Sequence, residues 1–107
     1  MSADAKYAAL VEQFDGRRSV THVAEGGFGS RGQLKVGGRI FAMLVGSELV
    51  VKLPAARVEA LVENGQGRYF DAGKGKPMRE WFVLTSSRTP WQPLAEEAFE
   101  FVQKVKS

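Results

Sequence analysis

Glycines punctuate three short apolar runs between Gly26 and Leu53, and this pattern constrains the fold more than any other part of the chain. Val36-Gly37-Gly38-Arg39 and Val45-Gly46-Ser47-Glu48 each offer a two-residue connection. A glycine in such a connection adopts positive φ at no steric cost, as primed hairpin turns require. The stretch therefore predicts a compact antiparallel meander.

The three runs differ in how they alternate. Gln33–Val36 alternates polar and apolar residues, which is typical of a half-exposed strand with Lys35 pointing outward. Ile40–Val45 is apolar on both faces, so we expect a central strand that is covered on both sides. The third run places three apolar side chains on one face: Leu49, Val51 and Leu53.

Three other segments carry helical patterns. Residues 3–15 repeat apolar side chains at helical spacing, and Gly16 follows where a left-handed cap is favoured. Pro54 begins a second helix that ends at Asn64-Gly65. Pro90 and Pro93 open a third helix. Its expected apolar stripe, from which Phe99 is left out, comprises Leu94, Ala98, Phe101, Val102 and Val105.

The remaining apolar segments predict further strands. Ser19–Val23 is short and β-branched, which favours an edge strand, Arg68–Phe70 favours a short strand, and Pro77–Thr85 favours a long one. The order of elements predicts an α+β fold: a two-layer domain with an antiparallel β-sheet, a meander of about four to five strands. The N-terminal, middle and C-terminal helices pack on that sheet, and residues 1–107 form a single domain.

An apolar face is left over once the helices are packed on one side of the sheet. Phe41, Met43 and Val45, or their neighbours, would form a large exposed apolar patch on a monomer. Because such patches usually mark interfaces, we expect a homodimer.

Composition excludes several classes of protein. The chain has no Cys, which rules out disulfides, thiol catalysis and cysteine-ligated metals. No apolar stretch approaches the roughly 18–20 residues of a membrane span, and Met1–Phe14 lacks a secretory apolar core. We therefore expect a cytoplasmic protein without a membrane partner.

Basic residues concentrate in the middle of the chain. Residues 17–88 contain 12 Lys and Arg against 6 Asp and Glu, whereas the two ends are acidic. This distribution is that of an ordinary solvated surface or of a site for an anionic partner such as nucleic acid. The residues expected to contact the anion in the second case are Arg17, Arg18, Arg31, Arg39, Lys74, Lys76 and Arg79.

A glycine-rich segment matches a dinucleotide-binding pattern by letters only. Gly27–Gly32 reads G-x-G-x-x-G, but the motif requires a helix to follow and here a strand follows. The alternative is a tight loop, formed by Gly26, Gly27, Phe28 and Gly29, with close packing beneath Phe28. Gly73–Pro77 lacks the spacing and the hydroxyl of a Walker loop, which favours a basic turn.

No residue set specifies a reaction. His22 is the only histidine, so neither a two-histidine metal site nor a histidine relay is available. Ser86–Thr89 has no neighbouring base that would activate a hydroxyl, and the three glutamates of the last helix read as a solvated face: Glu96, Glu97 and Glu100. We expect no catalytic, metal or cofactor residues and a non-enzymatic protein.

Two tryptophans lie near basic segments. Exposed aromatic side chains beside Arg and Lys can stack the bases of single strands. For Trp81, which alternates with strand residues, the other interpretation is core packing. For Trp91, the other interpretation is that its ring fastens the last helix to the sheet.

An ordered set of features from Ala24 to Lys104 resembles the TfoX N-terminal domain family, which is related in shape to YjbR-like proteins. The features are Gly26-Gly27-Phe28-Gly29, Arg39-Ile40-Phe41-Ala42, Leu49–Leu53 entering a helix, Tyr69-Phe70, Gly75-Lys76-Pro77, Trp81-Phe82 and a closing helix after Trp91. One position departs from the family pattern: the proline that usually closes the strand near Leu84 in that family is replaced here by Thr85.

The resemblance implies an α+β domain of bacterial proteins associated with the regulation of competence for DNA uptake. In that family the domain usually precedes a second domain. Because the sequence ends at Ser107 without such a domain, we expect a stand-alone single-domain relative. It implies no catalytic residues. The leading functional hypothesis is a regulatory or protein-interaction module with an unknown protein partner, and the alternative is a nucleic-acid-binding protein that uses the basic central region.

Overall fold

The computed structural model of the chain describes residues 2–23, 30–70 and 78–105. Within these residues, three helices and six strands confirm the α+β class, with a sheet slightly larger than the predicted four to five strands. The elements follow the chain in this order: α1 (Ala3–Phe14), β1 (Val20–Val23), β2 (Ser30–Val36), β3 (Arg39–Val45), β4 (Glu48–Lys52), α2 (Ala55–Glu63), β5 (Gly67–Phe70), β6 (Met78–Leu84) and α3 (Trp91–Val105).

The strands form one antiparallel sheet in the order β1-β2-β3-β4-β6-β5. Strands β2, β3 and β4 are the predicted meander, and β1 is the predicted edge strand. The turns of the meander contain Gly37, Gly38 and Gly46 with positive φ, as the hairpin signals require. The chain then leaves the sheet through α2 and returns as the β5–β6 hairpin, with β6 inserted beside β4. This insertion puts β5 at the edge of the sheet.

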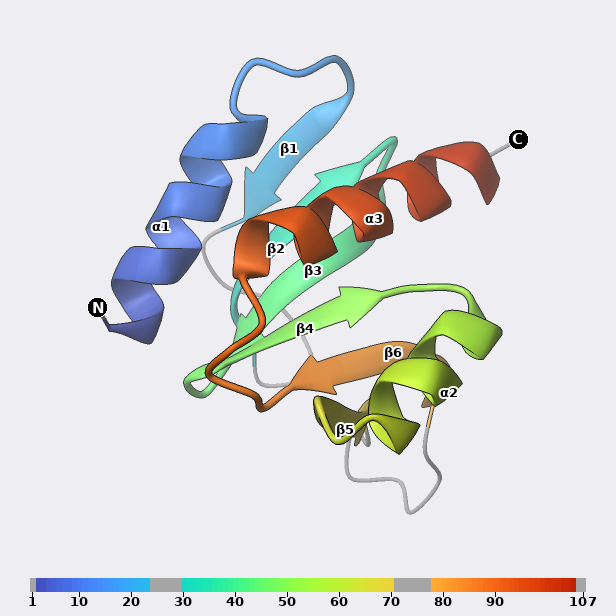
Figure 1. Cartoon of the computed structure of the whole chain (residues 1–107). Coiled ribbons are helices and arrows are strands. Elements are labelled where there is room, and N and C mark those ends of the chain that lie inside the picture. Colours follow the sequence, from blue (N-terminus) through green and yellow to red (C-terminus); the bar gives the residue numbers. More distant parts are fainter. Residues whose placement is uncertain (1, 24–29, 71–77, 106–107) are drawn as a thin grey trace.

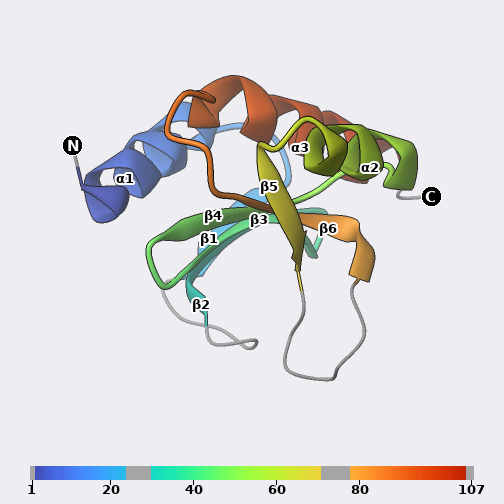
Figure 2. The same ribbon diagram turned by 60° about the horizontal axis from the view of Figure 1, so that its bottom comes forward.

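All three helices lie on the same face of the sheet (Figures 1 and 2). In Figure 1, α3 crosses over the central strands between α1 and α2. Alternate residues of β4 and β6 point into this helix layer, so Leu49, Val51 and Leu53 share one buried face as predicted. The main core between the two layers is completed by side chains from every helix, including Leu10, Phe14, Val58, Leu61, Leu94 and Val102.

A β-bulge changes the face on which Phe41 lies. Leu34 pairs with Ala42, but the next residue, Lys35, pairs with Ile40, so Phe41 is an extra residue in β3. Phe41 and Ala42 therefore both belong to the main core, whereas Met43 lies on the opposite face. The sequence pattern grouped Phe41 with Met43 and Val45 because simple alternation contains no bulge.

The face opposite the helices, which we call the open face, has its own apolar cluster. This open-face cluster consists of Met43, Val50, Phe70 and Val83. Met43 and Val50 are each only 1% exposed, with Ile40, Val45 and Trp81 packed against the cluster. The expectation of a large exposed apolar patch is therefore wrong at the centre of this face, and the homodimer that was inferred from it stays a prediction.

Two further side chains differ from the predicted pattern. Gln33 is buried at 4% exposure, because it faces Met43 in the middle of the open face rather than solvent. Phe99 is buried and contacts the rings of Phe14 and Phe41, whereas Phe101 is only partly buried. The predicted apolar stripe of α3 was wrong to leave out Phe99. Because α3 packs against α1 as well as against the sheet, its buried face is wider than one stripe.

Candidate nucleic-acid interface

One end of the sheet gathers several basic segments. Because neighbouring strands are antiparallel, the starts of β1, β3 and β6 lie at the same end as the last residues of β2 and β4. The register fixes this directly: Val36 pairs with both Val20 and Arg39, and Lys52 pairs with Trp81. We call this the basic end and define it by four segments: residues 15–19, 35–40, 52–54 and 79–81.

The charges of the basic end are mostly positive. Asp15 and Glu80 are the acidic residues of the four segments, and the basic residues are Arg17, Arg18, Lys35, Arg39, Lys52 and Arg79. Arg18, Arg39 and Arg79 are exposed. Within the described part of the chain, none of these three guanidinium groups has an ion-pair partner. Topology thus brings together predicted contact residues from three distant parts of the sequence.

The other predicted contact residues are not placed at this end by the described structure. Arg31 follows Ser30, which pairs with Val45 at the opposite end of the sheet. The side chain of Arg31 lies outside the described residues, as do Lys74 and Lys76. The predicted glycine loop, consisting of Gly26, Gly27, Phe28 and Gly29, also lies outside them.

Arg17 differs from the other arginines because it is bound within the chain. Its guanidinium donates two hydrogen bonds to the carboxylate of Glu96 on α3, one of them from Nη1 to Oε1 at 3.0 Å. The same group lies 4.5 Å from the ring centroid of Phe14 and 5.2 Å from that of Phe99. Gln13 also donates to Glu96. This arrangement fastens the end of α1 to α3, so Arg17 acts as a structural contact.

Two more arginine–glutamate pairs connect separate elements, one of them across the intervening strand β6. Arg57 of α2 donates to Glu97 of α3, with Nε 2.8 Å from Oε1, and Arg68 of β5 donates to Glu48 of β4. Glu96 and Glu97 are therefore each paired with an arginine. The sequence analysis missed these pairs because it interpreted the glutamates as a solvated helix face. No local signal in α3 could reveal them, because the arginines lie 40 or more residues away in sequence.

We expect Glu96→Gln to lower the free energy of unfolding at neutral pH by a few tenths to about 1 kcal/mol, since the pair is half-exposed. Hydrogen bonding from Arg17 holds the pKa of the Glu96 carboxyl below its ordinary value of 4.5. The ion pair therefore contributes its full share to the free energy of unfolding above about pH 4.5, the pKa of this carboxyl in the unfolded chain. That share is lost as the pH falls through the lower pKa of the folded state. Urea unfolding at several pH values measures this.

The matched control is Glu100→Gln, which changes an exposed glutamate on the same helix. It should leave the free energy of unfolding almost unchanged at every pH. A difference between the wild type and Glu96→Gln that stays constant as the solution is acidified would contradict the assigned ion pair.

Two lysines of the basic end were missed as candidate contact residues. Lys35 is half-buried and lies on the open face beside Ile40, its pairing partner. Lys52 has its Nζ 5.7 Å from the ring centroid of Trp81. The alternation of each strand could have found both, because it places these lysines opposite the buried apolar residues.

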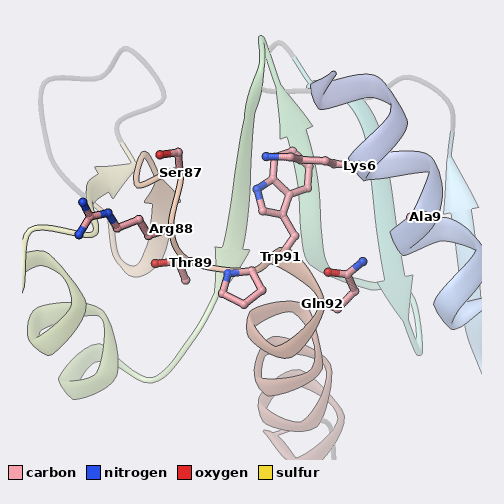
Figure 3. A pocket seen from close by; sticks show the side chains of 8 residues that line it. Lys6, Ala9, Ser87, Arg88, Thr89, Trp91 and Gln92 are labelled. Atoms are coloured by element: carbon pink, nitrogen blue, oxygen red, sulfur yellow. The ribbon is translucent and has the colours of Figure 1, made fainter. Parts of the chain in front are cut away.

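A second place where cations lie near an aromatic ring is a pocket of about 380 Å³ at the N-terminus of α3. It is lined by residues of α1, of the loop between β6 and α3, and of the first turn of α3. Figure 3 shows its lining, in which Arg88 points away from Lys6 and Trp91. The Nζ of Lys6 lies 5.5 Å from the ring centroid of Trp91, which is itself buried in the main core. The pocket therefore does not direct its two cations at one point.

The glycine motif has a structural explanation at its last position. Gly32 lies inside β2, so no helix begins where a dinucleotide site would need one. A Cβ on Gly32 would come within 2.7 Å of the Tyr7 ring, which shows how closely α1 packs on this strand. Burial raises the pKa of the Tyr7 hydroxyl, and that hydroxyl has no hydrogen-bond partner in the described structure.

Other site classes find little support in the described residues. His22 is exposed on edge strand β1, and its ring centroid lies 6.3 Å from that of Tyr7. The described part of the chain contains no group of three or more His, Asp or Glu that could hold a metal ion. None of its helices combines the length and apolar character needed to cross a bilayer.

Comparison with known proteins adds no assignment. No family model matches the chain, and neither the curated proteins nor the solved structures compared with it contain a match. The resemblance to the TfoX N-terminal domain family therefore stays a prediction from sequence.

Proposed function

We propose that this chain is a binding module that holds the backbone of a nucleic acid at its basic end. The observation that carries the proposal is the placement of Arg18, Arg39 and Arg79 along one end of the sheet, all exposed and without ion-pair partners among the described residues. In contrast, the arginines elsewhere in the fold include Arg57 and Arg68, whose charges are neutralised by glutamates.

The dimensions of the basic end suit an extended polyanion. Five inter-strand gaps of about 4.8 Å each make the six-stranded sheet roughly 24 Å wide. One strand of B-DNA carries a phosphate every 3.4 Å or so, so several phosphates fit along this width. Cations that neutralise phosphates release condensed counterions, and this release favours binding strongly at low salt.

The alternative of a protein-interaction module has less support. It rested on the absence of a catalytic constellation, on strands that are apolar on both faces and on the family resemblance. The open-face cluster to which those strands contribute is buried within the single chain. A polyanion needs no apolar patch, because phosphate binding derives from charge and counterion release. We therefore favour nucleic acid over a protein partner for this surface.

Arg39→Glu should weaken binding to short DNA and RNA by roughly 3- to 10-fold at about 50 mM salt, since it removes one phosphate contact and adds a repulsive charge. The slope of log affinity against log salt should become shallower by about one phosphate. Fluorescence anisotropy with labelled oligonucleotides, repeated over a salt series, measures both quantities.

Arg88→Glu is the matched control. It also replaces an exposed arginine and changes the net charge by the same amount, but Arg88 lies beyond the opposite end of the sheet, in the loop after β6. Its effect on affinity should be much smaller. Equal losses for the two variants would show that only net charge matters, and no binding by the wild type at low salt would overturn the proposed function.

A further inference from the structure

Trp81 is an accessible aromatic side chain within the basic end. It is half-buried, packs against the open-face cluster and lies on the side of the sheet away from the helices. Trp91, in contrast, is 8% exposed and belongs to the main core. Of the two tryptophans that the sequence offered as stacking residues, Trp81 is the more exposed, and it is the one that lies in the basic end.

Two hollows meet beside Trp81 at Arg79. One hollow, of about 510 Å³, is lined by Ala55, Arg79, Glu80 and Trp81. The other, of about 480 Å³, shares Ala55 and Arg79 and is lined by Tyr69, which is half-buried, and by Glu59. Arg79 thus lines both hollows, one beside Trp81 on the open face and one beside Tyr69, which packs against the main core on the helix side. The Nζ of Lys52 lies over the Trp81 ring.

We infer that the nucleic acid bound at the basic end is single-stranded, and that one of its bases stacks on Trp81. This inference rests on the proposed function and adds the class of ligand. Base stacking on an aromatic side chain requires an unstacked base, which a duplex does not offer and a single strand does. When the base stacks, Lys52 moves its ammonium from the Trp81 ring to a flanking phosphate, and Arg79 contacts the other flanking phosphate. Lys35, three strands away on β2, contacts a phosphate further along the nucleic acid.

The two acidic residues of the hollows fit a base better than a phosphate. Glu59 and Glu80 would repel a phosphate that entered either hollow. Their carboxylates accept hydrogen bonds from exocyclic amino groups, such as the N4 amine of cytosine. The hollows are therefore assigned to bases, and the backbone is assigned to the basic residues around them.

The test compares Trp81→Leu and Trp81→Phe with the wild type for binding to a labelled oligo-dC of about 12 nucleotides and to a duplex of the same length. Trp81→Leu should weaken single-strand binding by about 10-fold or more, because stacking is lost. Trp81→Phe should retain most of the affinity, since its ring still stacks. The weaker duplex binding should be the same for all three proteins.

A second readout isolates Trp81 spectroscopically. In a Trp91→Phe background, Trp81 is the only tryptophan, so its fluorescence should be quenched on saturation with oligo-dC. Phe101→Leu serves as the control for loss of an aromatic side chain, because Phe101 lies on α3 on the helix side of the sheet. Thermal unfolding confirms that each variant is folded.

The outcomes separate this inference from the proposed function. Salt-dependent binding with equal affinity for single strands and duplex, unchanged in Trp81→Leu and without quenching, would overturn the stacking site and leave the proposed function intact. No binding of either ligand by the wild type would overturn both. Selective loss of single-strand binding in Trp81→Leu, together with quenching, supports the inference.

Discussion

Replacing Gly67 with alanine should destabilise the protein by about 3 kcal/mol or more. A Cβ at this position would lie 1.9 Å from the backbone carbonyl oxygen of Val83 and 2.5 Å from Cζ of Phe82. Gly67 starts β5, and the adjacent strand β6 approaches it directly. Because a backbone atom cannot rotate away as a side-chain end can, relief would require β5 to move off β6. Urea unfolding followed by tryptophan fluorescence measures the loss.

Gly46→Ala is the control for the general effect of replacing a glycine. Gly46 has a φ of +61° and no atom within 4 Å of its would-be Cβ, so its substitution adds backbone strain without a clash. A left-handed conformation costs an alanine about 1–2 kcal/mol. If Gly67→Ala were no more destabilising than Gly46→Ala, the close approach of β5 and β6 would be wrong.

Local patterns predicted the elements of this fold well. Gly37, Gly38 and Gly46 identified the hairpins because a two-residue turn between apolar runs needs positive φ, which is a local requirement. Gly65, which also has positive φ, follows the predicted end of α2. Gly67 differs, since its role depends on a strand that lies more than ten residues further along the chain. Nothing in its immediate sequence reveals that contact.

The basic end shows the same division between local and long-range information. The sequence identified Arg18, Arg39 and Arg79 as candidate contact residues, but not that their three separate segments lie along the same end of one sheet. That placement follows from the antiparallel register and from the insertion of β6 beside β4. Arg17 belonged to the same predicted set and is bound instead to Glu96, a partner 79 residues away.

Phe41→Ala should lower the free energy of unfolding by about 3–5 kcal/mol. The bulge in β3 turns the Phe41 ring into the main core, where it is fully buried. Its centroid lies 5.0 Å from that of Phe14, in an edge-on arrangement, and 5.5 Å from that of Phe99. Removing the ring opens a cavity where α1, α3 and the sheet meet. Denaturant unfolding of the variant measures the loss.

Val45→Ala provides the comparison that tests the bulge. Regular alternation would put Phe41 and Val45 on the same face, whereas the bulge leaves Val45 half-buried beside the open-face cluster. Its truncation should cost about 1 kcal/mol, because it removes only partly buried methyl groups. Similar small losses for both variants would mean that Phe41 lies on the open face. We expect a loss several times larger for Phe41→Ala, because the bulge changes the alternation of β3 between these two residues and places only Phe41 in the main core.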